Sequence, residues 1–240
     1  MVFASYYIAA QTQKATLYYN FEGTGDTIID KSSKGNDGAL FNGANRVDDA
    51  KFGKGIQFDG VDDYAKLPTK GIIEEPGAGT VAVWAKVIKT QGGGGFPVIF
   101  AHDVNMIHFA IRNGNWWVHR GDENGDAKKD SGVQVKVETW YHLALTWNNR
   151  SAFFYLDGDS IVKWDYPSRA LLFDFFYLSS SNGGEHFFNG IIDELKIFKG
   201  TLTQAQVKDE MNEGIKLAVF PKGKLTAVWG KIKFNSHIGR

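Results

Sequence analysis

The chain has 240 residues, and its 27 basic and 27 acidic side chains give a formal net charge of zero. This balance provides no electrostatic attraction to nucleic acid or to an anionic membrane, so we expect no nucleic-acid partner. The sequence contains no cysteine, which excludes disulfides and thiolate metal sites, and no apolar run reaches the roughly 18–20 residues of a membrane span, so no membrane insertion is expected.

The N-terminal segment, residues 1–14, has two interpretations. Residues 2–10, "VFASYYIAA", are similar to the end of a secretory signal before a small-residue cleavage site, although no Lys or Arg precedes them. They are also compatible with an N-terminal strand. The first interpretation predicts an exported protein.

The stretch from Phe21 to Gly38, "FEGTGDTIIDKSSKGNDG", concentrates acidic residues and glycines around one apolar pair. Two interpretations stay open here. Asp30 and Asn36 can bond neighbouring amides in a capped surface turn, or the loop can offer oxygen ligands to a cation.

Strands are predicted where apolar and other residues alternate with a period of two. The abundant aromatic residues and the 28 glycines suit short strands joined by tight turns. In "TVAVWAKV" and "WYHLALTW" the residues expected on the core face are Val81, Val83, Ala85, Val87, Tyr141, Leu143, Leu145 and Trp147. The opposite faces then carry Trp84 and His142. The run "QGGGGF", residues 91–96, is predicted to be a flexible loop.

Two dipeptides, Asn113-Gly114 and Asp157-Gly158, predict two-residue hairpins. Around the first, counting outward pairs Ala110 with Trp117 and His108 with His119. Ile111, Trp116, Phe109 and Val118 then share the core face. The strands are therefore predicted to be mostly antiparallel.

A helix is predicted over residues 203–213 in "LTQAQVKDEMNEG". Thr203 and Gln206 form a capping-box pair, and Gly214 suits the position just after the last helical turn. Residues 214–240 contain six basic side chains and no acid, and we interpret them as a basic C-terminal extension.

Five stretches occur in one order between residues 15 and 213: "LYYNFEGTGDTIIDKSSKGNDGAL", "GKGIQFDGVDDYAKLP", "TVAVWAKV", "WYHLALTWNNRSAFFYLDGDSI" and "FFNGIIDELKIFKGTLTQAQV". In this order they resemble laminin-G-like jelly-roll domains of the concanavalin A-like lectin/glucanase superfamily. The resemblance implies an all-β, two-sheet antiparallel jelly-roll sandwich over residues 15–213. It also implies a structural calcium and a binding or adhesive role in a secreted or cell-surface multidomain protein.

A metal site is predicted from the late strand "GIIDELKIF". Strict alternation places Asp193 on one face with Ile191, Leu195 and Ile197, and a buried carboxylate needs a cation or backbone donors. The resemblance maps calcium binding onto Glu22, Asp30, Asn36 and Asp193. We therefore expect a structural Ca²⁺ that joins the first strand to the last.

A ligand face is predicted from aromatic and imidazole side chains on the strand faces opposite the core. The expected set is Trp84, His108, Trp117, His119 and His142, which could line one concave sheet surface suited to a glycan. Ordinary packing is the alternative interpretation. A zinc site formed by imidazoles of neighbouring strands, including His102, is a further alternative.

The predicted function is a non-catalytic module that binds a carbohydrate or a cell-surface protein, beside other modules of an exported protein. Glycoside hydrolysis requires two carboxylates flanking the bond, and no suitable pair occurs on one strand face. The enzymatic alternative is a glycan-active enzyme, a polysaccharide lyase or a hydrolase, that uses the concave face, and a lyase would draw on the imidazoles and Tyr141. A structural spacer is the third possibility.

Overall fold

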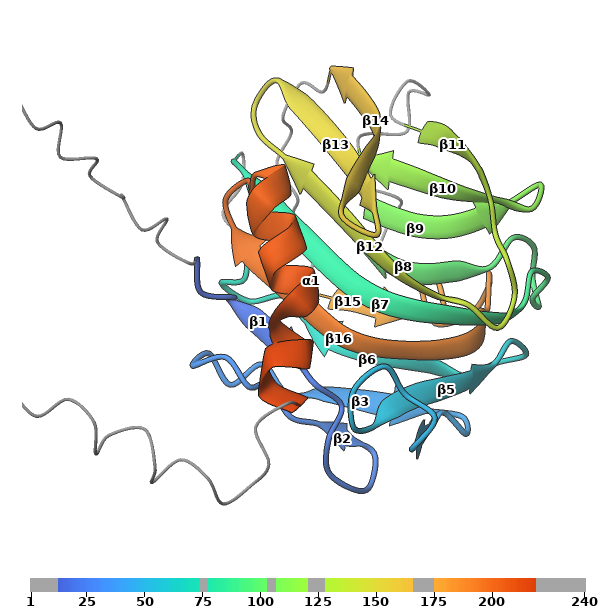
Figure 1. The fold of residues 1–240 in the computed structure, drawn as a ribbon. Coiled ribbons are helices and arrows are strands. Elements are labelled where there is room, and N and C mark those ends of the chain that lie inside the picture. Colours follow the sequence, from blue (N-terminus) through green and yellow to red (C-terminus); the bar gives the residue numbers. More distant parts are fainter. Residues whose placement is uncertain (1–12, 74–76, 103–106, 121–127, 166–174, 219–240) are drawn as a thin grey trace, which may run out of the picture.

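The structure is a computed structural model that describes residues 13–73, 77–102, 107–120, 128–165 and 175–218. These residues form two antiparallel sheets that face each other, with one helix against the outside of the first (Figure 1). The predicted fold class, an all-β two-sheet sandwich with one short helix, is confirmed. No helix among these residues has both the length and the apolar character needed to cross a bilayer.

The sheet beneath the helix, called sheet I, has eight strands. In spatial order they are β14 (Asp159–Asp165), β13 (Ser151–Leu156), β12 (Trp140–Trp147), β7 (Gly79–Lys89), β16 (Asn189–Lys199), β5 (Gly55–Asp59) and β4 (Asn45–Val47), with β1 (Leu17–Tyr19) also paired to β16. The long central pair, β7 and β16, joins the two halves of the sheet.

The second sheet, called sheet II, also has eight strands. Their spatial order is β11 (Lys128–Gln134), β10 (Asn115–Arg120), β9 (Ile107–Arg112), β8 (Val98–His102), β15 (Phe175–Leu178), β6 (Tyr64–Pro68), β3 (Gly38–Phe41) and β2 (Thr27–Ile28).

The core lies between the sheets and follows the alternation of the strands. All eight residues predicted to face the core from β7 and β12 belong to one buried cluster. Phe109 of sheet II meets Phe154 of sheet I at 6.0 Å between ring centroids, so aromatic rings bridge the layers. Burying such a side chain completely stabilises the folded state by roughly 1.5–3 kcal/mol relative to leaving it exposed.

Both predicted hairpins are confirmed. Asn113 and Gly114 have φ of 51° and 79°, and Asp157 and Gly158 have the same pair of values, as a turn with two left-handed residues requires. The register of β9 and β10 is the one obtained by counting, with Trp117 opposite Ala110 and His119 opposite His108.

The helix α1 (Gln204–Ala218) begins as predicted and ends later. The Thr203 amide donates to Gln206 Oε1 at 2.9 Å and the Gln206 amide to Thr203 Oγ1 at 3.3 Å, which completes the capping box. The predicted stop at Gly214 is wrong, because the helix continues through Gly214 to Ala218. Glycine ends a helix only when it takes the left-handed conformation.

The alternation predicted for the late strand is interrupted by a bulge. The pairing of β16 with β7 shifts between Asp193 and Lys196, and Glu194 has a φ of 51°. As a result Ile192, Leu195 and Ile197 lie in the core cluster, whereas Asp193 is opposite Trp84 on the outer face. The prediction that Asp193 shares a face with Leu195 and Ile197 is therefore wrong.

Both predicted terminal segments fall mainly outside the described residues. This holds for residues 1–12 of the N-terminal segment and residues 219–240 of the basic extension. Their boundaries stay predictions.

Candidate ligand-binding site

A pocket of about 220 Å³ opens on the outer face of sheet II. Its floor comes from β9 and β10 and its walls from two loops and the start of β11. The side chains that define it are Phe96, His108, Arg112, Trp117, His119, Lys128 and His186. The Asn113-Gly114 hairpin fixes which side chains of β9 and β10 face outward, and so places the pocket.

One wall is a four-layer stack of alternating aromatic and basic groups. The rings of His186 and Phe96 lie 4.1 Å apart with an interplanar angle of 31°. The Arg112 guanidinium carbon lies 4.6 Å from the Phe96 ring centre and 4.3 Å from that of Trp117. Arg112 is thus held between two aromatic faces, which favours a fixed orientation of its planar donors.

Two loops distant in sequence hold this wall in place. A Cβ on Gly92 would lie 1.8 Å from the Phe187 carbonyl oxygen, and the Phe187 amide donates to the Gly93 carbonyl at 3.0 Å. The glycine run is therefore packed against the 185–187 loop, and its predicted flexibility stays a prediction. His186 has a φ of 62°, an uncommon conformation for a residue with a side chain.

Two imidazoles form the inner end of the pocket. The rings of His108 and His119 meet edge to face at 5.6 Å, and both residues are buried. Burial and the neighbouring positive groups, His119 first among them, lower the pKa of His108 to about 3. Its Nε2 atom has no hydrogen-bond partner among the described residues. These imidazoles and His102 do not form a three-residue metal cluster in the described ranges, which leaves the zinc alternative without geometric support.

The charge of the lining is one-sided. Arg112 and Lys128 supply positive charge, the three imidazoles add no negative charge, and no carboxylate lines the pocket among the residues described. An acidic neighbour of the wall is Glu185, whose Oε1 lies 3.9 Å from His186 Nδ1. Burial lowers the pKa of His186; Glu185 opposes this shift and Arg112 adds to it, so the ring stays neutral over a wider pH range.

The predicted ligand set divides between the two sheets. His108, Trp117 and His119 lie on sheet II in the pocket. Trp84 and His142 lie on sheet I, with their rings 5.2 Å apart. The prediction that all five line one surface is wrong, because alternation within a strand does not say to which sheet the strand belongs.

Trp84 and His142 are covered from outside. Lys51 Nζ lies 3.9 Å from the Trp84 ring centre, and Phe52 meets the same ring edge to face at 6.3 Å. His142 is fully buried, and its Nε2 lies 2.8 Å from Glu210 Oε2 of α1. The packing alternative describes these two residues.

A buried ionic network joins α1 to sheet I. Glu210 Oε1 lies 3.2 Å from Lys196 Nζ, which also lies 3.2 Å from Glu213 Oε2. Burial favours the neutral form of Glu210, but His142 and Lys196 outweigh it and lower its pKa. Beside this network, Val207 packs on Ala82 and Ala144 of the sheet.

Asp30, one of the predicted metal ligands, is engaged by its own loop and by strand β1. Its carboxylate accepts hydrogen bonds from the amides of Tyr18, Ser32 and Asn36 at 3.2, 2.8 and 3.0 Å, and from Ser32 Oγ at 2.8 Å. The capped-turn interpretation describes this geometry.

Glu22 and Asp193 converge on one short segment of the chain. The Phe52 amide donates to Asp193 Oδ2 and the Lys54 amide to Glu22 Oε1, each at 2.8 Å. Burial raises the pKa of Asp193 to about 8, with contributions from Glu194 and Glu22. In the described part of the chain, Glu22, Asp30 and Asp193 do not form a three-ligand cluster.

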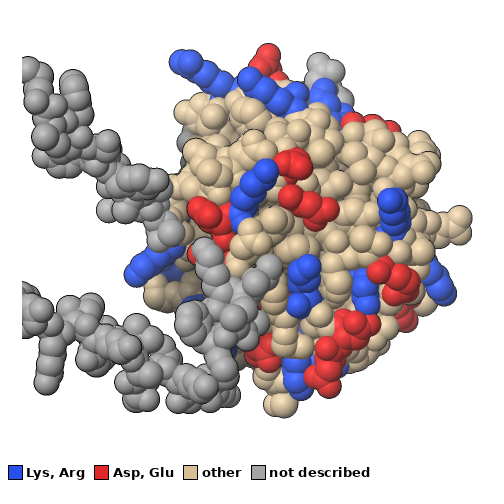
Figure 2. Space-filling model, in the orientation of Figure 1, with Lys and Arg blue, Asp and Glu red and all other residues tan. Residues whose placement is uncertain are grey.

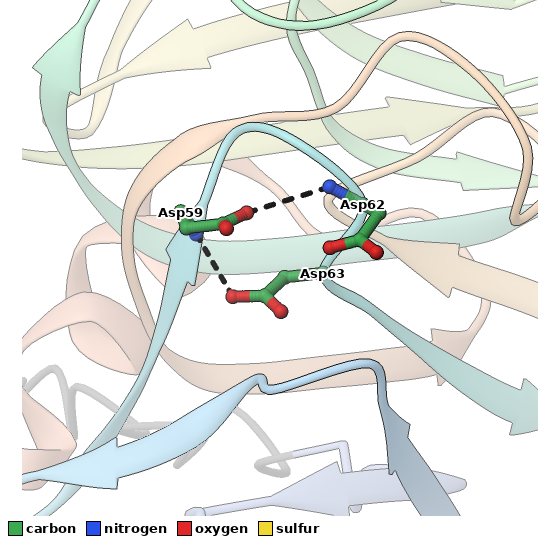
Figure 3. Close-up of side chains that lie close together, drawn as sticks. All are labelled: Asp59, Asp62 and Asp63. Carbon is green, nitrogen blue, oxygen red and sulfur yellow. Dashed lines mark hydrogen bonds between the residues drawn. The ribbon is translucent and has the colours of Figure 1, made fainter.

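A separate group of carboxylates lies in the turn between β5 and β6. Asp59, Asp62 and Asp63 each present an oxygen within 4.8 Å of the others (Figure 3). Asp63 Oδ2 accepts the Asp59 amide at 3.0 Å, and Asp59 Oδ1 accepts the Val61 amide at 2.7 Å. Through these hydrogen bonds the carboxylates of Asp59 and Asp63 stabilise the backbone of the turn.

The family follows from the sequence together with this architecture. The family model for the Concanavalin A-like lectin/glucanases superfamily matches residues 59–208. The chain belongs to this superfamily. The match includes every pocket residue, and the resemblance found in the five stretches is confirmed.

Solved structures share the superfamily fold. Domain 4 of AbnA, an extracellular arabinanase from Geobacillus stearothermophilus solved with arabinotriose, is 22% identical over 83% of this chain and 99% of that domain, with a TM-score of 0.66. The binding domain of Paraclostridial Mosquitocidal Protein 1 is 16% identical over 82% of this chain and 52% of that domain, with a TM-score of 0.67.

A third similar structure is the binding domain of botulinum neurotoxin DC in complex with rat synaptotagmin II. It is 11% identical over 82% of this chain and 51% of that domain, with a TM-score of 0.64. The chain thus spans about half the length of the two toxin domains. At these identities the likeness establishes the superfamily fold. No curated protein sequence matched the chain.

Sequence reasoning missed four residues of the pocket: Phe96, Arg112, Lys128 and His186. The signal for Arg112 was present, because the hairpin count already placed it on the same face as Ala110 and His108. Phe96 and His186 come from loops about 90 positions apart in this superfamily member, and no local pattern relates them.

Proposed function

We propose that the chain is a non-catalytic binding module of an exported protein, and that the sheet II pocket holds a carbohydrate. The observation that carries the proposal is the convergence of Trp117, Phe96 and Arg112 with two imidazoles in one open pocket. Aromatic surfaces combined with a few hydrogen-bonding groups are the usual chemistry of sugar recognition. The arabinanase domain, solved with arabinotriose, supports this ligand class.

A glycan-active enzyme is less well supported by the site. Hydrolysis needs two carboxylates about 5–9.5 Å apart, and the pocket lining contains none among the described residues. A lyase of the type considered would use Tyr141, but Tyr141 packs in the core against Trp116 at 5.2 Å between rings. The imidazoles of the pocket lie on the outer face of sheet II, away from the core in which Tyr141 packs.

A glycan array combined with a product assay tests the proposal. We expect the wild type to bind at least one glycan, Trp117→Ala to bind it at least tenfold more weakly, and neither protein to release reducing ends or unsaturated products. Product formation would instead support the enzyme. Absence of binding to every glycan would support either a spacer or a protein partner, of which the toxin domain bound to synaptotagmin is an example.

We also propose a structural Ca²⁺ with Glu22 and Asp193 as its carboxylate ligands. Both acids converge on residues 52–54, and the buried Asp193 carries a raised pKa, so a cation would stabilise its ionised form. Asp30 and Asn36 are proposed to shape the adjoining loop, since the backbone amide of Asn36 donates a hydrogen bond to the Asp30 carboxylate.

Export to the cell surface or medium completes the proposal. The support is the nature of the similar structures, an extracellular arabinanase domain and toxin binding domains. Fractionation of the source cells tests it: we expect the protein in the medium or surface fraction, and recovery from the cytosol alone would contradict this location.

A further inference from the structure

The guanidinium of Arg112 is held in place but has unused hydrogen-bonding capacity. It is stacked between Phe96 and Trp117 at 4.6 and 4.3 Å from their ring centres. Within the described ranges it donates no hydrogen bond and forms no ion pair, while it lines the pocket. A planar fork of donors in a fixed orientation matches the two oxygens of a carboxylate.

The surroundings favour an anion over a neutral group. Lys128, across from His119 on the neighbouring strand, lines the same pocket and has no ion pair with a described residue. The pKa of His108 is lowered mainly by burial, and His119, His186 and Lys128 lower it further because each disfavours an additional positive charge there. On the face drawn in Figure 2, which carries α1 and sheet I, acidic and basic side chains are instead interspersed.

We propose that the pocket recognises an acidic saccharide, with the carboxylate of a uronic acid bound by Arg112 and attracted by Lys128. This inference rests on the proposed carbohydrate-binding function and narrows its substrate class. The sugar ring would lie against Trp117. Arg112 occupies one face of this ring, and the side chain as a whole is half-exposed. Because no carboxylate lines the described part of the pocket, nothing there opposes the ligand charge.

The test uses a probe and its neutral counterpart. Calorimetric titration with tri-galacturonate and with its fully methyl-esterified form changes the charge of the ligand while keeping its sugar rings. We expect the acid to bind wild-type protein at least tenfold more tightly than the ester, and we expect added salt to reduce this preference. Equal affinity for the two forms, or binding of neither, would overturn the inference.

Variants locate the preference at the proposed residues. Arg112→Gln should reduce the acid-to-ester preference to within about twofold, and Lys128→Met should reduce it partially. Lys34→Met removes an equal charge in the loop between β2 and β3, at the opposite edge of sheet II, and should leave the preference unchanged. If Arg112→Gln does not fold, Lys128→Met measured against Lys34→Met decides the question; an unchanged preference in Lys128→Met would then overturn the inference.

Two further arms separate the carboxylated sugar from other anions. Free acetate at an equal carboxylate concentration should not displace tri-galacturonate, and displacement would reduce the site to one for a simple anion. A sulfated neutral oligosaccharide should bind more weakly than tri-galacturonate, and tighter binding would contradict the carboxylate assignment. Tight binding of the methyl ester at the pocket would overturn this inference and leave the carbohydrate-binding function in place.

Discussion

On sheet I the outer face is covered by α1, whereas on sheet II the outer face around β9 and β10 keeps an open pocket. Both faces carry histidines and tryptophans. His142 bonds with Glu210 of the helix, and Lys51 lies over Trp84. Trp117 and Arg112 stack on each other and line a pocket that no described helix covers. The difference shows that the same residue types serve stability under a helix and remain available for recognition where no helix lies.

The largest expected effect comes from breaking the ionic network under α1. Glu210→Gln removes the carboxylate partner of the buried His142 and one of the three carboxylates around the buried Lys196, which keeps Glu194 and Glu213. We expect a loss of about 3 kcal/mol in the free energy of unfolding, the lower end of the range for breaking a buried ion pair. Glu213→Gln is the matched control: it also pairs with Lys196 but is half-exposed, and it should cost less than about 1 kcal/mol. Equal losses in the two variants, measured by chemical denaturation, would contradict the network.

The same network predicts a pH dependence. The folded-state pKa of Glu210 lies below its ordinary value of 4.5. Its stabilising contribution is therefore fully present above about pH 4.5 and is lost as pH falls through the folded-state pKa. The stability difference between wild type and Glu210→Gln should accordingly shrink below pH 4.5. A difference that is constant from pH 7 to pH 3 would exclude this ionised role.

The calcium proposal predicts a smaller effect, at the place where Asp193 on the outer face of sheet I meets residues 52–54. At a calcium concentration about 100 times the dissociation constant, binding stabilises by about 2.7 kcal/mol, so chelator should lower the melting temperature by about 5–10 °C. Glu22→Gln should abolish this response, and Asp62→Asn should keep it. The reverse result would place the ion in the turn containing Asp59 and Asp63, and an unchanged melt would exclude a structural Ca²⁺.

A glycine substitution probes how the pocket wall is held. Gly92→Ala places a Cβ against the Phe187 carbonyl, and the clash should lower the free energy of unfolding by about 1–3 kcal/mol. It should also displace Phe96 and so weaken the binding of the ligand. Gly184→Ala in the opposing loop meets only ordinary contacts and should change neither quantity. Retention of full affinity in Gly92→Ala would show that Phe96 does not need this support.

The core and the hairpins could be predicted from the sequence because both depend on short-range patterns. The alternation in β7 and β12 placed all eight core residues correctly, and Asn113-Gly114 fixed the register of β9 and β10. The alternation of β16 failed at Glu194, since a bulge leaves no period-two signature. The site was only partly predictable, because the assignment of Trp84 and Trp117 to different sheets depends on long-range pairing.

The most direct test compares the two tryptophans that the sequence placed on one surface. Trp84→Leu and Trp117→Leu are measured against the strongest glycan from the array by calorimetric titration, with folding checked by thermal melts. The expected result is a loss of at least about tenfold in affinity for Trp117→Leu alone, with the larger loss of stability in Trp84→Leu. Weaker binding by folded Trp84→Leu together with unchanged binding by Trp117→Leu would contradict the assignment of recognition to sheet II.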